Sequence, residues 1–362
     1  MIAAAAATAG PATPGSVAAS PVAASPLAPG LLGHPLPRRV AVLRALTGLG
    51  DLLCLVPALR ALRAGLPDAR LTLVGLPEAA PVVERFPHYV DELVVLPGWP
   101  GLPEHEADLA KLVPFLASMQ ERSFDLALQL HGSGVVSNPL AALLGARHTA
   151  GFNLAGQFCP DPRRFLPYLD HEPEVRRALR LVEHLGLPAS DESLEFPLGP
   201  DDELALSAVE ETAGLAPGSY ACVHPGANVA PRRWPTERFA AVADGLARRG
   251  LAIVLTGTAG EASLTAAVAR AMDTPAIDLA GRTPLGALAA LVSKSRLLVA
   301  NDTGVSHLAG ALRTPSVVVF SASDPQRWAP LDQDRHRVIG PHPAASVDAV
   351  VAEVDHLLAV AR

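Results

Sequence analysis

The first residues with types suited to chemistry form a glycine-rich turn at 47–51 (TGLGD), between an apolar segment and a helical one. Gly48 and Gly50 let a ligand approach the backbone closely, and the start of the following helix offers unpaired N–H groups. Asp51 has two interpretations: a base that faces a cleft, or an N-cap that only holds the helix. A carboxylate at a helix N-terminus is also stabilised as its anion, so as a base Asp51 must depend more on position than on a tuned pKa.

A second candidate site lies in the segment HPGANVAPRRWP, residues 224–235, where a strand ends in a glycine turn. Asn228 lies in this loop, and Arg232 and Arg233 come just before Trp234 and a helix. The planar guanidinium of arginine suits phosphate oxygens and keeps its charge. Alone this signal is weak, because adjacent loop arginines are usually solvated and Trp234 can be the hydrophobic staple of the next helix.

Polar residues also follow two apolar segments later in the chain. The run DTGVSH, residues 302–307, opens a helix, where small hydroxyl and glycine residues make an anion site from N–H groups and the helix dipole. Alternatively, Asp302 or Thr303 is a plain N-cap and His307 a satisfied partner inside the helix. In the loop at 255–261, Glu261 can accept hydrogen bonds from ribose or sugar hydroxyls, or complement the dipole of the next helix.

An alternation of apolar and amphipathic segments must position these loops. Strands are predicted at residues 38–46, 70–75, 91–97, 124–132, 147–152, 220–226, 251–257, 276–281, 296–301 and 316–320. Helical segments separate them, and a last helix covers 346–362. Pro57 either kinks the first helix or marks its true first turn. Such alternation predicts an α/β protein with two Rossmann-like, doubly wound parallel sheets, whose ligands lie at the carboxyl ends of the strands.

The composition restricts the class of protein. Of 362 residues, 49% are hydrophobic and 4% aromatic, so two cores must form chiefly from Ala, Val and Leu. The formal net charge of −7 argues against broad binding of nucleic acid. The three cysteines are far apart and lack zinc spacing, which argues against disulfides and a structural metal. Asp332 and Asp334 resemble a DxD metal pair, but they lie in a polar loop outside the alternation, which argues against a metal there. The GxGxxG, G-x-S-x-G and Walker motifs are absent, and every apolar run is too short for a membrane span.

A stretch rich in Pro and charge, from about residue 160 to 200, leads to a domain boundary, after which the alternation restarts, so four regions are predicted. Residues 1–36 are rich in Ala, Pro, Ser and Gly, with almost no large apolar side chain, and are expected to be a disordered leader or the result of a misassigned translation start. Residues 37–200 and 201–341 are each expected to form one Rossmann-like domain, and 342–362 a C-terminal helix. Two such domains facing each other enclose a central cleft.

These loops, in this order, resemble glycosyltransferase family 9, best known for ADP-heptose:lipopolysaccharide heptosyltransferases. The resemblance extends from Arg38 to Pro330 and is carried by LRALTGLGDLLCLVPALRAL, FDLALQLHGS, VHPGANVAPRRWP and, most specifically, VANDTGVSHLAGAL. It implies a GT-B fold, with the acceptor on the first domain and the nucleotide sugar on the second. It also implies an inverting, metal-independent transfer of a sugar, heptose by family resemblance, to a hydroxyl of a cell-envelope glycan or glycolipid. No cofactor is implied, and an ADP-sugar is the favoured donor.

The resemblance also implies roles for single residues. The family's proposed base falls on Asp51, and the basic residue that contacts the donor phosphates, commonly lysine, falls on Arg232. The other donor-binding positions are Asn228, Glu261, Asp302, Thr303, Gly304 and His307, and the acceptor side is expected at Gly48, Gly50 and His131. Lysine is nearly absent here, so Arg44, Arg60 and Arg63 are the basic candidates near the acceptor.

Alternatives remain open at this point. A sugar-nucleotide epimerase or hydrolase on the same fold needs an extra acid/base pair, for which Asp51 and Glu261 are the candidates. A non-catalytic nucleotide-sugar-binding protein needs no base, and a nicotinamide dehydrogenase is disfavoured by the missing GxGxxG. The expected partners are the nucleotide sugar and a glycan or glycolipid acceptor, without nucleic acid. We expect a cytoplasmic monomer, with peripheral contact at the inner face of the plasma membrane left open.

Overall fold

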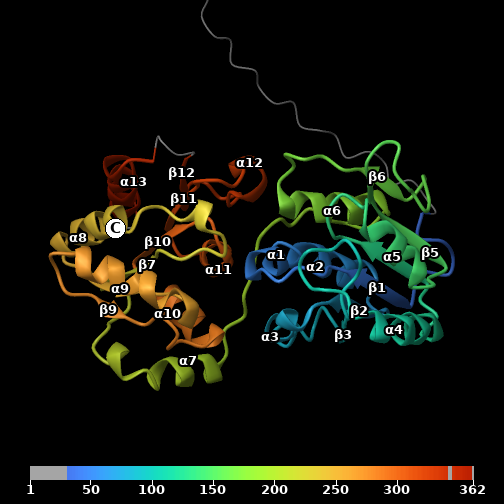
Figure 1. Cartoon of the computed structure of the whole chain (residues 1–362), viewed down its shortest axis with the longest axis horizontal. Coiled ribbons are helices and arrows are strands. Elements are labelled where there is room, and N and C mark those ends of the chain that lie inside the picture. Colours follow the sequence, from blue (N-terminus) through green and yellow to red (C-terminus); the bar gives the residue numbers. More distant parts are fainter. Residues whose placement is uncertain (1–30, 341–344, 361–362) are drawn as a thin grey trace, which may run out of the picture.

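The computed structural model describes residues 31–340 and 345–360. Figure 1 shows two α/β domains side by side, each containing a six-stranded parallel sheet. Leu31 and Leu32, at the end of the predicted leader, are buried in the first domain, and Arg164 Nε donates to the Leu31 carbonyl at 2.6 Å. The first domain therefore includes residues before position 37. Positions 1–30 of the predicted leader lie outside the described residues.

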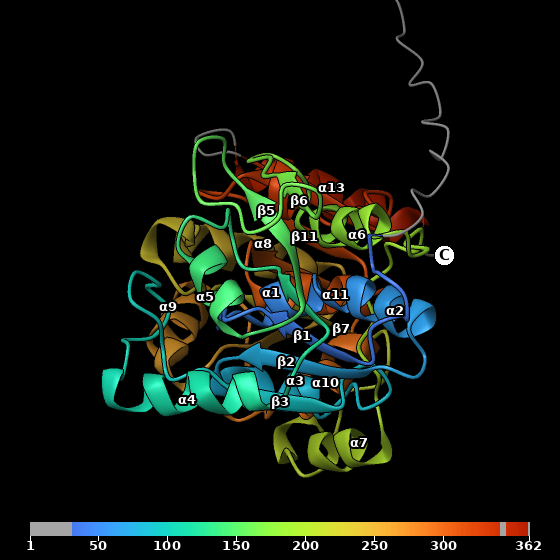
Figure 2. The same ribbon diagram turned by 90° about the vertical axis from the view of Figure 1, so that its right-hand side faces the viewer.

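The first domain contains the sheet β3-β2-β1-β4-β5-β6. Alternate residues of its central strand enter two cores, Val40 and Val42 on one face and Ala41 and Leu43 on the other, as the period of two in a strand requires. Figure 2 shows α4 and α5 on one side of this sheet and α2 and α6 on the other. The elements are β1 (Arg39–Leu43), α1 (Leu49–Leu53), α2 (Val56–Gly65), β2 (Arg70–Gly75), α3 (Ala80–Val83), β3 (Glu92–Val95), α4 (Leu109–Glu121), β4 (Leu126–Gln129), α5 (Ser137–Leu143), β5 (His148–Asn153), β6 (Phe165–Pro167) and α6 (Glu174–His184).

The second domain contains the sheet β12-β11-β10-β7-β8-β9. Val299 faces a core under α8 and α13, and its neighbours Leu298 and Ala300 face one under α10 and α11. The elements are α7 (Pro200–Ser207), β7 (Tyr220–His224), α8 (Thr236–Arg248), β8 (Ala252–Leu255), α9 (Ala262–Ala271), β9 (Ile277–Asp278), α10 (Leu285–Lys294), β10 (Leu297–Asn301), α11 (Gly304–Leu312), β11 (Ser316–Val319), α12 (Pro325–Trp328), β12 (His336–Ile339) and α13 (Val347–Val360).

The two sheets share one strand order, because the first and fourth strands of each domain lie next to each other at the centre. The connections leave in opposite directions at this point, which is where doubly wound folds bind ligands. The loops after β1 and β4 meet there in the first domain, and those after β7 and β10 in the second. All of the predicted site loops except the one carrying Glu261 begin at these four strand ends.

Several elements differ from the predictions. The single helix expected after residue 50 is two helices, and Pro57 lies in the first turn of the second one, α2, where proline needs no N–H partner. The strands β6 and β12 and the short helices α7 and α12 were not predicted. The final helix, α13, packs on α8, β11 and β12 of the second domain. No helix among the described residues combines the length and the apolar character needed to cross a bilayer.

The domains touch where α1 of the first meets α11 of the second, near the centre of Figure 1. A Cβ added to Gly50 would lie 2.4 Å from His307 Cδ2, and one added to Gly304 would lie 2.9 Å from Leu49 Cβ. Glycine therefore permits this close approach of the two chains. A small apolar cluster of Leu53, Phe196, Ala289 and Leu308 spans the same junction.

Candidate active site between the two domains

Asp51 is the third residue of α1, and Gly48 occupies the N-cap position without a side-chain hydrogen bond. The N-cap interpretation of Asp51 is therefore wrong. The carboxylate folds back over the turn, because a Cβ added to Gly48 would lie 2.3 Å from Asp51 Oδ2. The Asp51 side chain is 24% exposed. It thus stands at the domain junction, one residue after the glycine that contacts His307.

Burial raises the pKa of Asp51, and the negative charge of Glu174 adds to the increase, while Arg44, His307 and Arg327 oppose it. This corrects the expectation from the helix dipole, which by itself would stabilise the anion. Arg44 Nη2 lies 3.6 Å from Asp51 Oδ1 and donates to the Asp51 carbonyl at 3.1 Å. A carboxylate with a raised pKa is a stronger base than an ordinary surface aspartate.

The start of α11 has the geometry of an anion site. Thr303 is the N-cap in an extended conformation, and its side chain makes no capping bond, so the first N–H groups of the helix remain available. His307 lies one turn later and is buried, with Nδ1 3.6 Å from Cys54 Sγ. Burial lowers the pKa of His307, Arg232 lowers it further, and Asp302, Asp51 and Glu174 oppose the change. Carboxylate, imidazole and guanidinium therefore lie within electrostatic range of one another.

Asn301 joins two of the predicted donor loops. Its buried amide donates to the Pro225 carbonyl at 2.8 Å and accepts from the Trp234 N–H at 2.9 Å. This fixes the loop after β7 beside the start of α11. Arg233 Nε donates to the Ala227 carbonyl at 2.9 Å, whereas the guanidinium of Arg232 makes no hydrogen bond or ion pair with any part of the chain that the structure describes. Arg232 is thus the arginine of the pair that remains available for a ligand.

The other two predicted donor-side residues, Asn228 and Glu261, have different surroundings. Asn228 is exposed on the loop after β7. Glu261 forms a capping box, in which Oε2 accepts from Thr258 N–H at 2.8 Å, and a Cβ added to Gly226 would lie 2.1 Å from its Oε1. Glu261 is therefore both a helix-start acid and a carboxylate against the loop after β7. His224 Nε2 lies 4.0 Å away from it.

His131, predicted on the acceptor side, is buried at the end of β4. Its Nδ1 accepts from the Ala45 N–H at 3.2 Å, and Nε2 lies 3.7 Å from Glu104 Oε1. Burial, helped by Arg44, lowers the pKa of His131 to about 4, so the imidazole is neutral at neutral pH. In this structure the ring supports the turn after β1.

The predicted basic residues near the acceptor are all engaged. Arg44 binds Glu174 at 2.8 Å, Arg60 Nη2 donates to the Ser193 carbonyl at 2.8 Å, and Arg63 binds Asp91 at 2.6 Å. They hold elements of the protein together, so the expectation that they present basic groups to an acceptor is not supported by this geometry.

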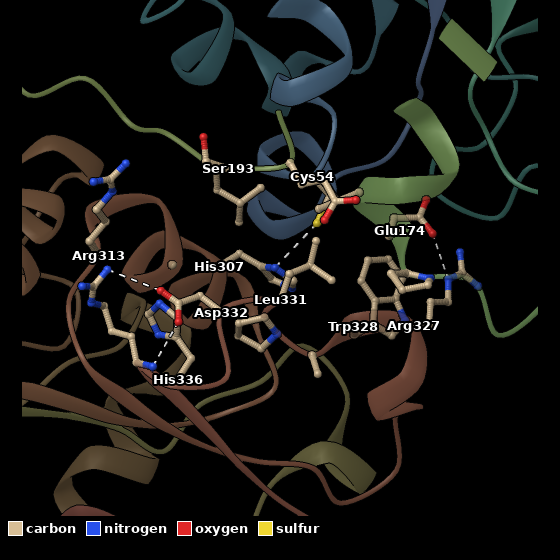
Figure 3. Close-up of a pocket in the computed structure, with 18 residues that line it drawn as sticks. Cys54, Glu174, Ser193, His307, Arg313, Arg327, Trp328, Leu331, Asp332 and His336 are labelled. Atoms are coloured by element: carbon tan, nitrogen blue, oxygen red, sulfur yellow. Dashed lines mark hydrogen bonds and ion pairs between the residues drawn. The ribbon is translucent and has the colours of Figure 1, made fainter. Parts of the chain in front are cut away.

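A cavity of about 500 Å³ also lies between the domains, on the side of α6 and α12 (Figure 3). Figure 3 shows Cys54 and His307 at its centre and Glu174 beside Arg327 at its edge. Of the predicted site residues, His307 lines this cavity, whereas Asp51, Arg232 and Asp302 do not. The cavity therefore lies on the α6 and α12 side of the junction of α1 and α11, and the other three residues lie outside its lining.

Sequence reasoning missed three residues that organise the site. Glu174 and Arg327 lie on segments whose charge is typical of solvated helices, yet they form an ion pair at 3.0 Å in which the Glu174 side chain is buried. Asn301 was visible as a polar residue at the end of a very apolar strand, which is the signal that could have identified it. Within residues 31–340 and 345–360, no three His, Cys, Asp or Glu side chains gather as a metal site.

The geometry suits a reaction in which a hydroxyl loses a proton and an anionic group departs, because the Asp51 carboxylate of one domain lies near His307 of the other, and the Arg232 guanidinium and the free N–H groups at the start of α11 lie on the same side of the second domain as that imidazole. Comparisons agree. The chain is 24% identical over 288 residues to lipopolysaccharide heptosyltransferase 3 of Escherichia coli (strain K12), which covers 78% of this chain and 82% of that protein.

Solved structures share the fold. The glycosyl transferase family 9 structure from Veillonella parvula DSM 2008 has a TM-score of 0.75 at 23% identity, covering 89% of this chain and 97% of that one. The E. coli ADP-heptose lps heptosyltransferase II structure has a TM-score of 0.70 at 21% identity, covering 90% and 99%. The predicted GT-B fold is confirmed. The model of glycosyltransferase family 9 (heptosyltransferase) matches residues 114–351, well over half of the sequence. The chain therefore belongs to glycosyltransferase family 9 and is a nucleotide-sugar glycosyltransferase.

Proposed function

We propose that this enzyme transfers heptose from ADP-heptose to a hydroxyl of a lipopolysaccharide core, with inversion and without a metal ion. Relatives matching about four fifths of the chain are named lipopolysaccharide heptosyltransferases 3 and 2, and the second solved neighbour is named for ADP-heptose. The observation that carries the proposal is the contact of Gly50 with His307, because it brings Asp51 to the start of α11.

In this mechanism Asp51 is the general base. It accepts the proton of the acceptor hydroxyl as that oxygen attacks the anomeric carbon from the face opposite the diphosphate, so that the configuration inverts. The raised pKa of the Asp51 carboxyl favours proton uptake, and Arg44 positions the carboxylate. A single base is sufficient for this chemistry.

The second domain stabilises the leaving diphosphate. Arg232 supplies a charge that pairs with no carboxylate among the described residues, and the N–H groups at the start of α11 supply a dipole and donors. Each such contact is worth about 2–4 kcal/mol when it strengthens in the transition state. These groups offset the charge that a metal ion would otherwise neutralise. Asn228, Asp302, Thr303, Gly304 and His307 complete the donor site, and Glu261 accepts from the ribose.

The first domain holds the acceptor. Gly48 and Gly50 let the acceptor sugar lie against the turn after β1, and His131 holds that turn by accepting a hydrogen bond from the Ala45 N–H. The enzyme works as a cytoplasmic monomer, at the inner face of the membrane that carries the lipid acceptor.

The decisive test is Asp51→Asn, assayed with ADP-heptose and a lipopolysaccharide acceptor. We expect transfer to fall about 10²- to 10⁴-fold, while the Kd for ADP, measured by calorimetry, stays within a factor of two. Asp68→Asn, an exposed aspartate on the same domain, is the matched control. Near-normal transfer by Asp51→Asn would refute the assigned base. A wild-type protein that binds ADP and transfers to no acceptor would instead be a binding protein.

A panel of nucleotide diphosphates tests the donor. A ligand that binds the native state alone stabilises it by mass action, by about 2.7 kcal/mol at a hundredfold excess over Kd. We expect ADP and ADP-heptose to raise Tm more than UDP, GDP or their sugars. Arg232→Gln should abolish most of that shift, whereas Arg233→Gln should keep it.

A further inference from the structure

Glu174, the first residue of α6, is a buried carboxylate in contact with three guanidinium groups. Its Oε1 accepts from Arg44 Nη1 at 2.8 Å, and its Oε2 accepts from Arg177 Nη1 and, at 3.0 Å, from Arg327 Nε. The Glu174 side chain is 3% exposed. Arg44 and Arg177 belong to the first domain, whereas Arg327 lies on α12 of the second, so one of these bonds crosses the junction (Figure 3).

Arg44 connects this cluster with Asp51. Besides Glu174, its guanidinium binds the Leu130 carbonyl at 2.7 Å and the Asp51 carbonyl at 3.1 Å, and Nη2 faces Asp51 Oδ1 at 3.6 Å. The Arg44 side chain is 4% exposed. Arg44 therefore holds the backbone of Asp51 by a hydrogen bond and stands beside its carboxylate, so it is the side chain placed to position that carboxylate.

The crossing bond is supported at its edge. His171 Nδ1 lies 2.7 Å from Asp324 Oδ2, which joins the segment before α6 to the N-cap of α12. That pair is exposed and contributes little to stability by itself. In the pair of Glu174 with Arg327 the carboxylate is buried and the guanidinium is partly exposed. Loss of this pair leaves Glu174 Oε2 bound to Arg177 alone and removes one positive charge from the neighbourhood of Asp51.

We propose that Glu174 is a positioning residue that links domain closure to the base: when Arg327 docks on Glu174, the carboxylate fixes Arg44, and Arg44 fixes Asp51 for reaction. This inference rests on the proposed role of Asp51. The base is then correctly placed only when the two domains are together, which protects the donor from attack by water in the open enzyme.

The charges around Asp51 make the link measurable. The charged groups near Asp51 are Arg44 after β1, Glu174 on α6, His307 on α11 and Arg327 on α12. The Cys54 thiol, at the end of the helix α1 that carries Asp51, is also close. Glu174 raises the pKa of Asp51, whereas Arg327 lowers it. Burial by itself would raise the pKa of Glu174, but the arginines outweigh burial and lower it to about 2, so Glu174 is charged at every working pH.

The test measures kcat, KM and the pH profile of kcat for Glu174→Gln and Arg327→Gln. Asp51 acts deprotonated, so activity falls as pH drops through its pKa. Glu174→Gln removes a negative charge and should move that acid limb to lower pH. Arg327→Gln removes a positive charge and should move it to higher pH. In both variants we expect kcat at the plateau to fall at least about tenfold, because the base is misplaced.

Three further variants make the result decisive. Arg327→Lys keeps the charge and should return the acid limb toward the wild-type pH. Arg180→Gln, on the same helix α6, breaks a pair with Glu172 that touches neither Asp51 nor the second domain, and should leave the profile unchanged. In the Asp51→Asn background, Arg327→Gln should cause no further loss of transfer, because the two residues act as a unit.

Arg327→Gln leaves the buried pairs of the first domain intact, so it tests the inference even if Glu174→Gln does not fold. Acid limbs that move in the same direction, or that do not move, would overturn the inference, as would losses that multiply in the double variant. If Asp51→Asn itself transfers normally, the base assignment fails and the inference fails with it. An inactive Asp51→Asn with unmoved acid limbs overturns the inference alone.

Discussion

Replacing Gly50 with alanine places a methyl group where the two domains touch. The new Cβ would lie 2.4 Å from His307 Cδ2, 3.1 Å from Nε2 and 3.2 Å from Cγ, so it would press on the ring at Cδ2. Carbon atoms in contact prefer about 3.5–4.0 Å. The ring or the whole second domain must therefore move by roughly 1 Å to relieve the overlap.

The imidazole has little room to retreat. His307 is 5% exposed, its ring packs edge-on against Trp328 at 6.1 Å between centroids, and its Nδ1 is 3.6 Å from Cys54 Sγ. We therefore expect the domains to separate by about the amount of the overlap. A 1 Å misplacement of reacting groups costs about a hundredfold in rate, which corresponds to about 2.7 kcal/mol of transition-state stabilisation.

Steady-state transfer is the assay, with Tm and the Kd for ADP measured on the same samples. We expect kcat to fall about a hundredfold, with Tm lowered modestly and ADP still bound by the second domain. Gly310→Ala on α11 is the control, because its Cβ would lie 3.5 Å from Leu194 Cδ1, an ordinary contact. Alanine there should raise helix stability by up to about 1 kcal/mol. Wild-type kcat in Gly50→Ala would refute the idea that close contact assembles the site.

Three further changes test the frame of the site. Arg85→Ala breaks a bidentate pair with Asp202 across the domains, at 2.6 and 2.7 Å, and should cost about 2 kcal/mol by thermal melting, whereas Arg70→Ala on an exposed pair should change little. Asn301→Ala separates the donor loops and should weaken ADP binding about tenfold by calorimetry. Burial lowers the pKa of His336 to about 4, so the unfolded chain takes up this proton first, and stability falls as pH drops from about 6.5 to 4. His336→Asn should remove up to roughly 3 kcal/mol of that change in acid melting curves, and an unchanged pH dependence would contradict the assignment.

Much of the fold was predictable because apolar periodicity is a local property. The strand β2 was predicted at its observed bounds, and the loops at the carboxyl ends of the strands followed from the alternation. The edge strands β6 and β12 were missed, because three or four residues with half-exposed side chains carry too little pattern. The break between α1 and α2 was left open by Pro57, which fits both a kink and a first turn.

The site was less predictable where it depends on tertiary packing. Spacing alone does not distinguish an N-cap from the third residue of a helix, and the backbone assigns the cap to Gly48 instead of Asp51. The charges of α6 are typical of a solvated face, yet Glu174 and Arg177 are buried. Their partners, Arg44 and Arg327, lie 130 and 153 residues away from Glu174 in the sequence, so no local pattern could join them.

The shared strand order of the two sheets has a mechanical consequence. Each half carries its reacting groups on a rigid body with its own core, and both halves point the same edge of the sheet at one hinge-like seam. In the proposed mechanism, a rotation about that seam moves Arg232 and the N–H groups of α11 together, relative to Asp51 on the other domain. Closing the domains assembles the site, and opening them releases the nucleotide product. A substitution that makes the seam more rigid should therefore slow turnover even when every reacting side chain is intact.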